Sequence, residues 1–211
     1  MNRDLFDDVT LELAPGALLL RGFALDTLDE LLSGIAAIQA LAPLRQMHTP
    51  GGLRMNVAMS NCGPLGWVSD AAGYRYQPTD PLSGKPWPAL PAAFAGLATR
   101  AAAAAGFKDF CPDACLVNRY EPGTALSLHQ DKNERDFSQP IVSVSLGLPA
   151  VFLFGGLTRS ERPMRVALNH GDVVVWGELA RLRFHGVMAL ADGLHPVWGR
   201  QRINLTMRRA G

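Results

Sequence analysis

The second half of the chain consists of short apolar or alternating stretches separated by residues that favour turns. After Asp113 these stretches have the length of strands and are too short for typical helices. Glu121-Pro122-Gly123 and Gly155-Gly156 are two of the intervening turns. Short strands at this spacing are typical of an antiparallel sandwich or jelly roll. The expected strands are 114–120, 127–131, 141–148, 151–154, 165–168, 172–176, 184–187 and 202–208.

The first half predicts helices instead. A short strand at 17–21 precedes a helix that Asp26 opens, in which leucine and isoleucine recur at helical spacing up to Ile38. A second helix is expected from Pro91 to Ala105, and Gly106 ends it. Helices followed by strands indicate an α+β fold, in which the helices brace one sheet of the jelly roll.

A Gly- and Pro-rich stretch, about 46–87, separates the two expected helices and contains Trp67, Tyr74, Tyr76 and Trp87. Long irregular segments in a compact domain are more often binding loops than filler, so we interpret this stretch as a substrate-recognition flap. The 211 residues fit one catalytic domain, 1–211, with the jelly-roll core at about 113–211 and a monomer as the default state.

Charge, hydropathy and cysteine content limit which partners and which cellular compartment we expect for the protein. Lys+Arg 20 against Asp+Glu 19 gives a net charge of +1, so any binding of nucleic acid must use a local basic patch. The chain has no apolar run long enough to cross a membrane, and residues 1–8 do not resemble a signal peptide. Cys62, Cys111 and Cys115 cannot all pair with one another, so with no signal peptide we expect reduced thiols in a cytoplasmic protein. A zinc site at 111–115 is not expected, because no second Cys/His pair completes it.

Three residues form a candidate metal site. In an extended strand, His129 and Asp131 point to the same face, and His185 lies downstream on another expected strand. Two histidines and one carboxylate suit Fe(II) and leave positions open for oxygen and a co-substrate. We interpret the remaining histidines as structural; they are His48, His170 and His195.

The last expected strand carries polar residues on one face. Arg202, Asn204, Thr206 and Arg208 alternate with Ile203, Leu205 and Met207, and Asn118 and Tyr120 show the same two-residue period on another strand. Guanidinium groups bind carboxylates through paired hydrogen bonds, so this lining suits a dicarboxylate such as an α-keto diacid that chelates iron. The two arginines lie about 20 Å apart along the strand, so both must reach inward to hold one diacid. Two alternatives remain open at this point: a metal-dependent hydrolase, and a non-catalytic nucleic-acid-binding β domain.

Four motifs follow one another along the second half of the chain: Asn118-Arg119-Tyr120, Leu128-His129-Gln130-Asp131, Phe184-His185-Gly186 and Arg202-Ile203-Asn204-Leu205-Thr206-Met207-Arg208. In this order they resemble the bacterial AlkB alkylation-repair dioxygenases, and the resemblance extends over nearly the whole chain. It implies an iron(II)- and 2-oxoglutarate-dependent jelly roll that uses O2 to oxidise the methyl group of a damaged base, such as 1-methyladenine or 3-methylcytosine, and releases formaldehyde, succinate and CO2.

The resemblance also implies roles for individual residues. His129, Asp131 and His185 would hold iron. The distal carboxylate of 2-oxoglutarate would be bound by Arg202, Tyr120 and Asn204, and its metal-proximal end would lie near Arg208 and Asn118.

On the substrate side, the resemblance implies alkylated DNA, preferably single-stranded, and RNA as a further substrate. The damaged base must leave its stack, so Trp67 and Tyr74 are candidates for stacking on it opposite His129, with Tyr76 a further candidate. Lys132 and Arg159 are candidates for phosphate contacts.

Two departures from the family pattern bear on substrate choice. Asn133 stands where family members have an aspartate beside the base, which predicts a weaker preference for cationic over neutral lesions. Asp70-Ala71 stands where they have basic residues, which predicts a weaker hold on the DNA strand there.

Overall fold

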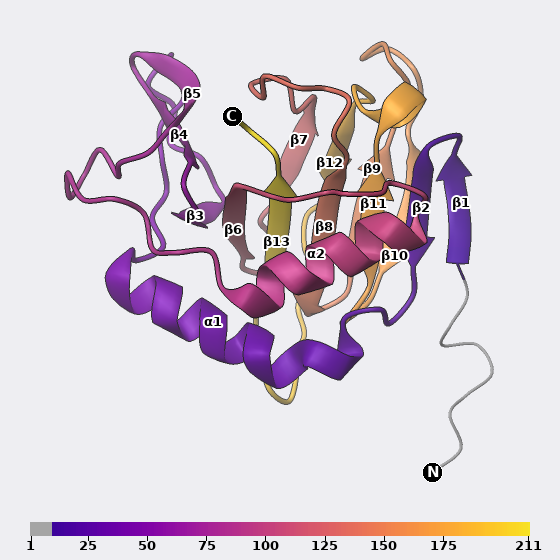
Figure 1. The fold of residues 1–211 in the computed structure, drawn as a ribbon, viewed down its shortest axis with the longest axis horizontal. Helices are drawn as coiled ribbons and strands as arrows, with labels where there is room; N and C mark the ends of the chain where they lie inside the picture. The colour runs from indigo at the N-terminus through magenta and orange to yellow at the C-terminus, as the bar shows by residue number, and fades with distance from the viewer. Residues whose placement is uncertain (1–9) are drawn as a thin grey trace.

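The structure is a computed structural model that describes residues 10–211; residues 1–9, in which no targeting signal is expected, lie outside the described part. Its strands form a seven-stranded sheet, a four-stranded sheet and a two-stranded hairpin, and all the pairings between them are antiparallel (Figure 1). The larger sheet has the order β1 (Thr10–Ala14), β2 (Ala17–Leu20), β11 (Val173–Trp176), β8 (Ile141–Gly147), β13 (Arg202–Arg208), β6 (Ala114–Tyr120) and β3 (Ala58–Cys62). The smaller sheet has the order β10 (Met164–Leu168), β9 (Ala150–Phe154), β12 (His185–Val187) and β7 (Leu126–His129), and the hairpin pairs β4 (Gly66–Asp70) with β5 (Gly73–Gln77).

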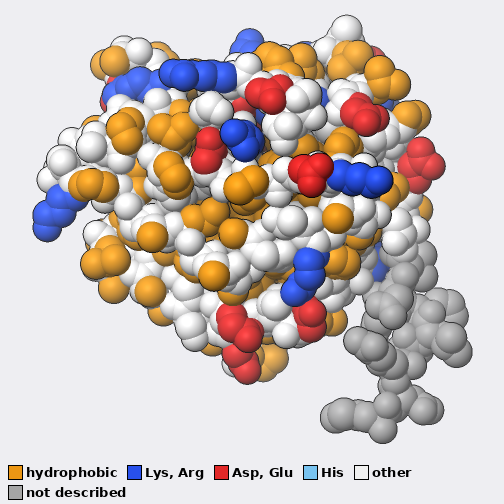
Figure 2. Space-filling model, in the orientation of Figure 1, with side chains coloured by type: hydrophobic (Ala, Val, Ile, Leu, Met, Phe, Trp, Pro, Cys, Tyr) orange, Lys and Arg blue, Asp and Glu red, His pale blue; other side chains and the backbone are white. Residues whose placement is uncertain are grey.

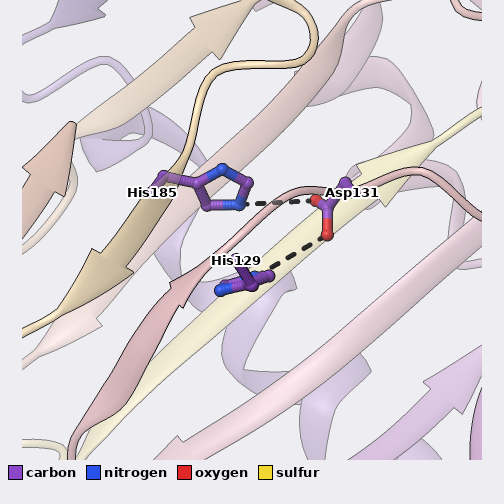
Figure 3. A group of neighbouring side chains, drawn as sticks. All are labelled: His129, Asp131 and His185. Atoms are coloured by element: carbon purple, nitrogen blue, oxygen red, sulfur yellow. Dashed lines mark ion pairs between the residues drawn. The ribbon is translucent and has the colours of Figure 1, made fainter. Parts of the chain in front are cut away.

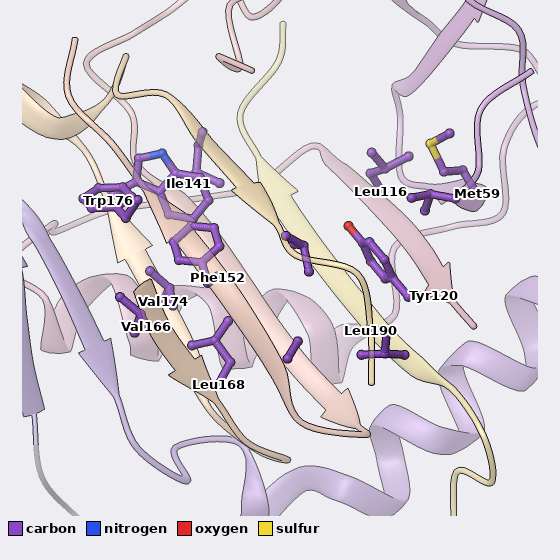
Figure 4. Close-up of a cluster of buried hydrophobic side chains, with 14 of the residues drawn as sticks. Met59, Leu116, Tyr120, Ile141, Phe152, Val166, Leu168, Val174, Trp176 and Leu190 are labelled. Atoms are coloured by element: carbon purple, nitrogen blue, oxygen red, sulfur yellow. The ribbon is translucent and has the colours of Figure 1, made fainter. Parts of the chain in front are cut away.

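The two larger sheets enclose one hydrophobic core. Phe152 of β9 packs toward Trp176 of β11, with ring centroids 6.1 Å apart (Figure 4). Phe154 of the same strand lies edge-on to that indole, with ring centroids 6.5 Å apart. Val166 and Leu168 of β10 close the same cluster. Burial of these side chains is the main force holding the sheets together. The expected jelly-roll architecture is confirmed.

A second core lies between the larger sheet and the helices α1 (Leu28–Leu41) and α2 (Ala92–Ala104), which cross its outer face (Figure 1). The alanines of α2 that face the sheet are fully buried, so this helix packs close to the strands. A Cβ at Gly34 of α1 would lie 2.7 Å from the Phe94 ring of α2, which shows how tightly the two helices touch. The expected bracing of one sheet by N-terminal helices is therefore confirmed.

Three features differ from the expected elements. The strand expected at 127–131 ends at His129, so Asp131 lies in the loop beyond β7. The stretch 46–87 is not irregular throughout, because it contains β3 and the β4–β5 hairpin. β1 was not expected at all. In β3 the polar residues Ser60 and Asn61 obscure the strand pattern, yet both are buried and their side chains bond to backbone groups of 42 and 67.

The face covered by α1 and α2 carries scattered acidic and basic side chains among apolar ones, without a continuous basic patch (Figure 2). Among residues 10–211, no helix is long and apolar enough to span a membrane.

Candidate active site

The three expected metal ligands lie close together (Figure 3). His129 ends β7, Asp131 lies in the loop that follows, and His185 begins β12. His129 and His185 are direct partners in the register of these strands, and their ring centroids lie 4.4 Å apart. Nε2 of His129 lies 3.8 Å from one carboxylate oxygen of Asp131, and Nε2 of His185 lies 3.6 Å from the other. The ligand atoms of all three residues lie within 4.8 Å of one another, a spacing that one ion between them can bridge. Two imidazoles and one carboxylate fit Fe(II).

The histidine rings already have the tautomer that a metal requires. Nδ1 of His129 lies 2.9 Å from the carbonyl oxygen of Ser127, and Nδ1 of His185 lies 3.0 Å from that of Arg183. A carbonyl can only accept, so Nδ1 carries a proton in each ring, and Nε2 is the atom that faces Asp131. Burial, aided by the neighbouring His185, lowers the pKa of His129 to about 4. At neutral pH the His129 ring is therefore uncharged, and its Nε2 can bind a metal.

Asp131 lies in the loop after β7, and side chains from distant parts of the sequence hold it in place. Arg181, which is 2 % exposed, donates from Nη1 to the backbone carbonyl of Asp131 over 2.8 Å. The Gln130 amide donates to the carbonyl of Leu182 over 2.6 Å, which ties the loop after β7 to the segment before β12. Arg208 donates from Nε and Nη2 to one carboxylate oxygen of Asp131, at 3.0 and 2.5 Å. Burial by itself raises the pKa of Asp131, but the charge of Arg208 outweighs it and, with the neighbouring His185 and His129, holds that pKa well below its usual range.

Arg202 supplies a buried cation at the other end of the site. It is 1 % exposed, its guanidinium lies 5.0 Å from the centre of the Tyr120 ring, and its Nε donates to the Ser145 hydroxyl over 3.0 Å. Its Nη1 has no hydrogen-bond partner within residues 10–211. A buried guanidinium with a free donor is costly unless an anion reaches it, so this end of the site fits a carboxylate.

Asn204 and Asn118 continue this polar lining as direct partners on β13 and β6. The Asn204 amide donates to the Ser143 hydroxyl and to the Val144 carbonyl, and its oxygen accepts from Thr206. The Asn118 amide lies 3.4 Å from the same Asn204 oxygen. These contacts fix the amides on the polar face that the alternation of β13 predicted.

A cavity of about 1090 Å³ connects the metal ligands with the buried arginine and with the β4–β5 hairpin. Almost every residue expected in the site lines it, although strands far apart in the sequence supply them. The lining includes His129, Asp131, His185, Asn118, Tyr120, Arg202, Asn204, Arg208, Trp67, Tyr74, Lys132, Asn133 and Arg159. Tyr76 is the exception, because its hydroxyl donates to Glu134 over 2.7 Å and the ring does not line the cavity.

The hairpin presents an aromatic pair to this cavity. Trp67 of β4 and Tyr74 of β5 are stacked, with ring centroids 5.7 Å apart and an interplanar angle of 14°. The indole N–H of Trp67 donates to the side-chain oxygen of Asn133 over 3.2 Å. Since an indole N–H can only donate, Asn133 must present its oxygen to Trp67, which leaves its NH2 group for other partners. Asp70 pairs with Arg75 of the same hairpin, and this contact lowers the pKa of Asp70 to about 2.

The histidines and cysteines outside the metal site have structural surroundings. His170 accepts a hydrogen bond from the backbone N–H of Gly147, and His195 accepts from those of Val197 and Trp198. The three cysteines are free thiols.

Two residues around Asp131 were missed by the sequence analysis, namely Arg181 and Glu134. They form a buried ion pair of 3.0 Å, with each side chain 2 % exposed. Their partners lie about 50 residues away along the chain, so no local pattern marks them.

The jelly roll, the two-histidine, one-carboxylate set and the free buried guanidinium together define an iron(II)- and 2-oxoglutarate-dependent oxygenase. The chain matches the 2OG-Fe(II) oxygenase superfamily over residues 16–208. It is 57 % identical to the alpha-ketoglutarate-dependent dioxygenase AlkB of Salmonella typhimurium, over 94 % of this chain and 92 % of that protein. The chain therefore belongs to the AlkB family of alpha-ketoglutarate-dependent dioxygenases. It is an enzyme, with Fe(II) as its metal and 2-oxoglutarate and O2 as co-substrates, and the hydrolase and non-catalytic alternatives are wrong.

More distant relatives show the same family. The nucleic acid dioxygenase ALKBH1 of Homo sapiens is 36 % identical over 58 % of this chain and 31 % of its own length. The solved structure of OsALKBH1 superimposes with a TM-score of 0.81 at 29 % identity, and covers 95 % of this chain and all of the other.

Proposed function

We propose that this enzyme removes methyl groups from alkylated nucleobases in DNA, with 1-methyladenine and 3-methylcytosine as typical substrates and RNA as a further substrate. The observation that carries the proposal is the cavity itself. Its lining includes the metal ligands, the stacked pair Trp67 and Tyr74, and the buried guanidinium of Arg202. One cavity with these groups would accommodate both a flipped base and a 2-oxoglutarate molecule.

The charge and burial of the polar residues on β6 and β13 suggest how 2-oxoglutarate would be bound. Arg202, with Tyr120 and Asn204, would bind the distal carboxylate of 2-oxoglutarate, and Arg208 and Asn118 lie on the metal side of that pocket. Iron, 2-oxoglutarate and O2, when bound, would supply an oxidation that removes the N-methyl carbon as formaldehyde, while 2-oxoglutarate is converted to succinate and CO2. The enclosing β-sheets keep the polar residues of this pocket fixed, so little reorganisation accompanies the reaction.

The β4–β5 hairpin would supply the binding site for the flipped base. Trp67 and Tyr74 offer aromatic faces that would replace the stacking lost when a base leaves its strand, and His129 lines the same cavity. Lys132 and Arg159 line the same opening and would contact phosphates, which supplies the local basic patch that a net charge of +1 does not reveal. A single strand delivers an unpaired base at lower cost than a duplex, so we propose a preference for single-stranded DNA. We also propose a monomer in the cytoplasm, where its three free thiols stay reduced.

The decisive experiment measures formaldehyde and succinate released from a single-stranded oligonucleotide with one 3-methylcytosine. We expect release that depends on iron, 2-oxoglutarate and the methyl group, and equal amounts of the two products. His129→Ala should abolish turnover and leave the fold intact, because this half-buried side chain lies at the cavity and not in the core. Succinate release that ignores the methylated base would contradict the proposed substrate.

A further inference from the structure

A buried group of four charges lies directly behind the metal site. It consists of the carboxylates of Asp131 and Glu134 and the guanidinium groups of Arg181 and Arg208, and we call it the buried quartet. Arg208 is shared, with 2.5 Å to Asp131 and 3.4 Å to Glu134, and Arg181 pairs with Glu134 over 3.0 Å. Two acids balance two bases, so the quartet has no net charge before a metal binds.

Glu134 competes with Asp131 for the guanidinium group of Arg208. A guanidinium that binds Asp131 alone would withdraw charge from the carboxylate and place a cation beside the metal position. Glu134 offers Arg208 a second carboxylate from a side chain that is 2 % exposed, so the attraction between Arg208 and Glu134 is only weakly screened. The position of Glu134 therefore bears on how strongly Asp131 can bind a cation.

The β4–β5 hairpin holds Glu134 in that position. The Tyr76 hydroxyl donates to Glu134 over 2.7 Å, and burial raises the pKa of Tyr76 well above its usual value, so the hydroxyl remains a donor. Tyr76 is the direct cross-strand partner of Trp67, whose indole N–H bonds to Asn133. Two paired residues of the hairpin thus bind two consecutive residues, Asn133 and Glu134, of the loop that follows Asp131.

We propose that Tyr76 and Glu134 are positioning residues that couple the docked state of the β4–β5 hairpin to the affinity of the site for its metal. When the hairpin is docked, Tyr76 fixes Glu134, Glu134 shares Arg208, and Asp131 is available to the ion. When the hairpin separates, Glu134 keeps Arg181 but loses the Tyr76 hydroxyl, which binds the carboxylate oxygen that faces Arg208, and Arg208 pairs more fully with Asp131. Coupling of this kind is reciprocal, so metal binding must also stabilise the docked hairpin.

The test uses the whole protein with Co(II) as the probe, without nucleic acid, 2-oxoglutarate or oxygen. Titration followed by visible absorption gives the Co(II) dissociation constant for the natural protein and for Tyr76→Phe, which removes one hydroxyl and no charge. We expect the constant to rise about tenfold, at the lower end of the range for residues that support metal ligands. Tyr74→Phe is the matched control on the same strand, because the Tyr74 hydroxyl makes no hydrogen bond within the described residues; its Co(II) affinity should equal that of the natural protein.

Two further measurements complete the test. Hydrogen exchange of the amides of 66–77 should slow when Co(II) binds to the natural protein, and should slow less in Tyr76→Phe. Glu134→Gln should weaken Co(II) binding by about 10- to 100-fold if the variant folds. If Glu134→Gln does not fold, the Tyr76→Phe variant alone tests the proposal. A Co(II) affinity of Tyr76→Phe within twofold of the natural value, or hairpin exchange that ignores the metal, would overturn the proposal. Neither result depends on nucleobase demethylation, so failure of that activity would be recognised separately.

Discussion

Gly186 controls the distance between the two strands that carry the metal-binding histidines. It directly follows His185 on β12, and its Cα faces the backbone of β7. A Cβ at this position would lie 2.6 Å from the carbonyl oxygen of Leu126, 3.1 Å from the carbonyl carbon of Ser127 and 3.2 Å from the backbone nitrogen of Leu128. All three atoms belong to the backbone, so no rotation of a side chain can relieve the contact.

The size of the disturbance follows from these distances. Ordinary contact begins at 3.4 Å, so the closest atom must retreat by about 0.8 Å, and Gly186→Ala must separate β12 from β7. Metal sites tolerate deviations of only about 0.2 Å in ligand distance. Because His129 and His185 are partners across this strand pair, we expect Gly186→Ala to weaken metal binding at least about 100-fold. The overpacking should lower the free energy of unfolding of the metal-free protein by about 1–3 kcal/mol.

The assay combines Co(II) titration with chemical unfolding of the metal-free protein. Gly96→Ala is the matched control, because it lies within α2 and a Cβ there meets nothing within 4 Å. It should leave the Co(II) affinity unchanged and raise the free energy of unfolding by about 0.4–1 kcal/mol. A folded Gly186→Ala protein with the natural Co(II) affinity would refute the idea that strand spacing sets the ligand geometry.

Three further predictions concern co-substrate, substrate and pH. Arg202→Met should raise the KM for 2-oxoglutarate about 100-fold, because a hydrogen-bonded charge pair contributes about 3 kcal/mol; its Co(II) affinity should not change, and an unchanged KM would exclude Arg202 from the co-substrate pocket. Asn133→Asp should raise the ratio of kcat/KM for 3-methylcytosine to that for neutral 3-methylthymine at least about fivefold, since a carboxylate near the cationic base contributes about 1 kcal/mol even in water. Asn169→Asp adds the same charge outside the cavity lining and should leave that ratio unaltered, so equal ratios in all three proteins would count against Asn133. In the metal-free protein, an NMR titration should find the midpoint of His129 at about pH 4, and a midpoint between 6 and 7 would contradict its burial. Because the unfolded chain binds that proton near pH 6.5, the contribution of His129 to stability should fall as the pH drops from 6.5 to 4.

Local patterns in the sequence were sufficient for most of the fold. The two-residue alternation of β6 and β13 predicted both strands with the bounds that the structure has, because one face of each is apolar and the other lines the cavity. The helical spacing that ends at Ile38 and the glycine at 106 likewise placed α1 and α2. Such patterns depend on which side of an element is buried, and the order of apolar and polar residues along the element shows that side directly.

The sequence by itself also determined which chemical groups the site contains: the three metal ligands and the residues expected to bind 2-oxoglutarate all line one cavity. Only the tertiary structure decided how Asp131 is held, since it lies beyond the end of β7 and depends on Arg181 and Arg208. The same is true of Tyr76, which the sequence placed beside the substrate and the structure places against Glu134. The packing of whole sheets determines which side chains meet when they lie tens of residues apart, and a local sequence pattern does not show which pairs will form.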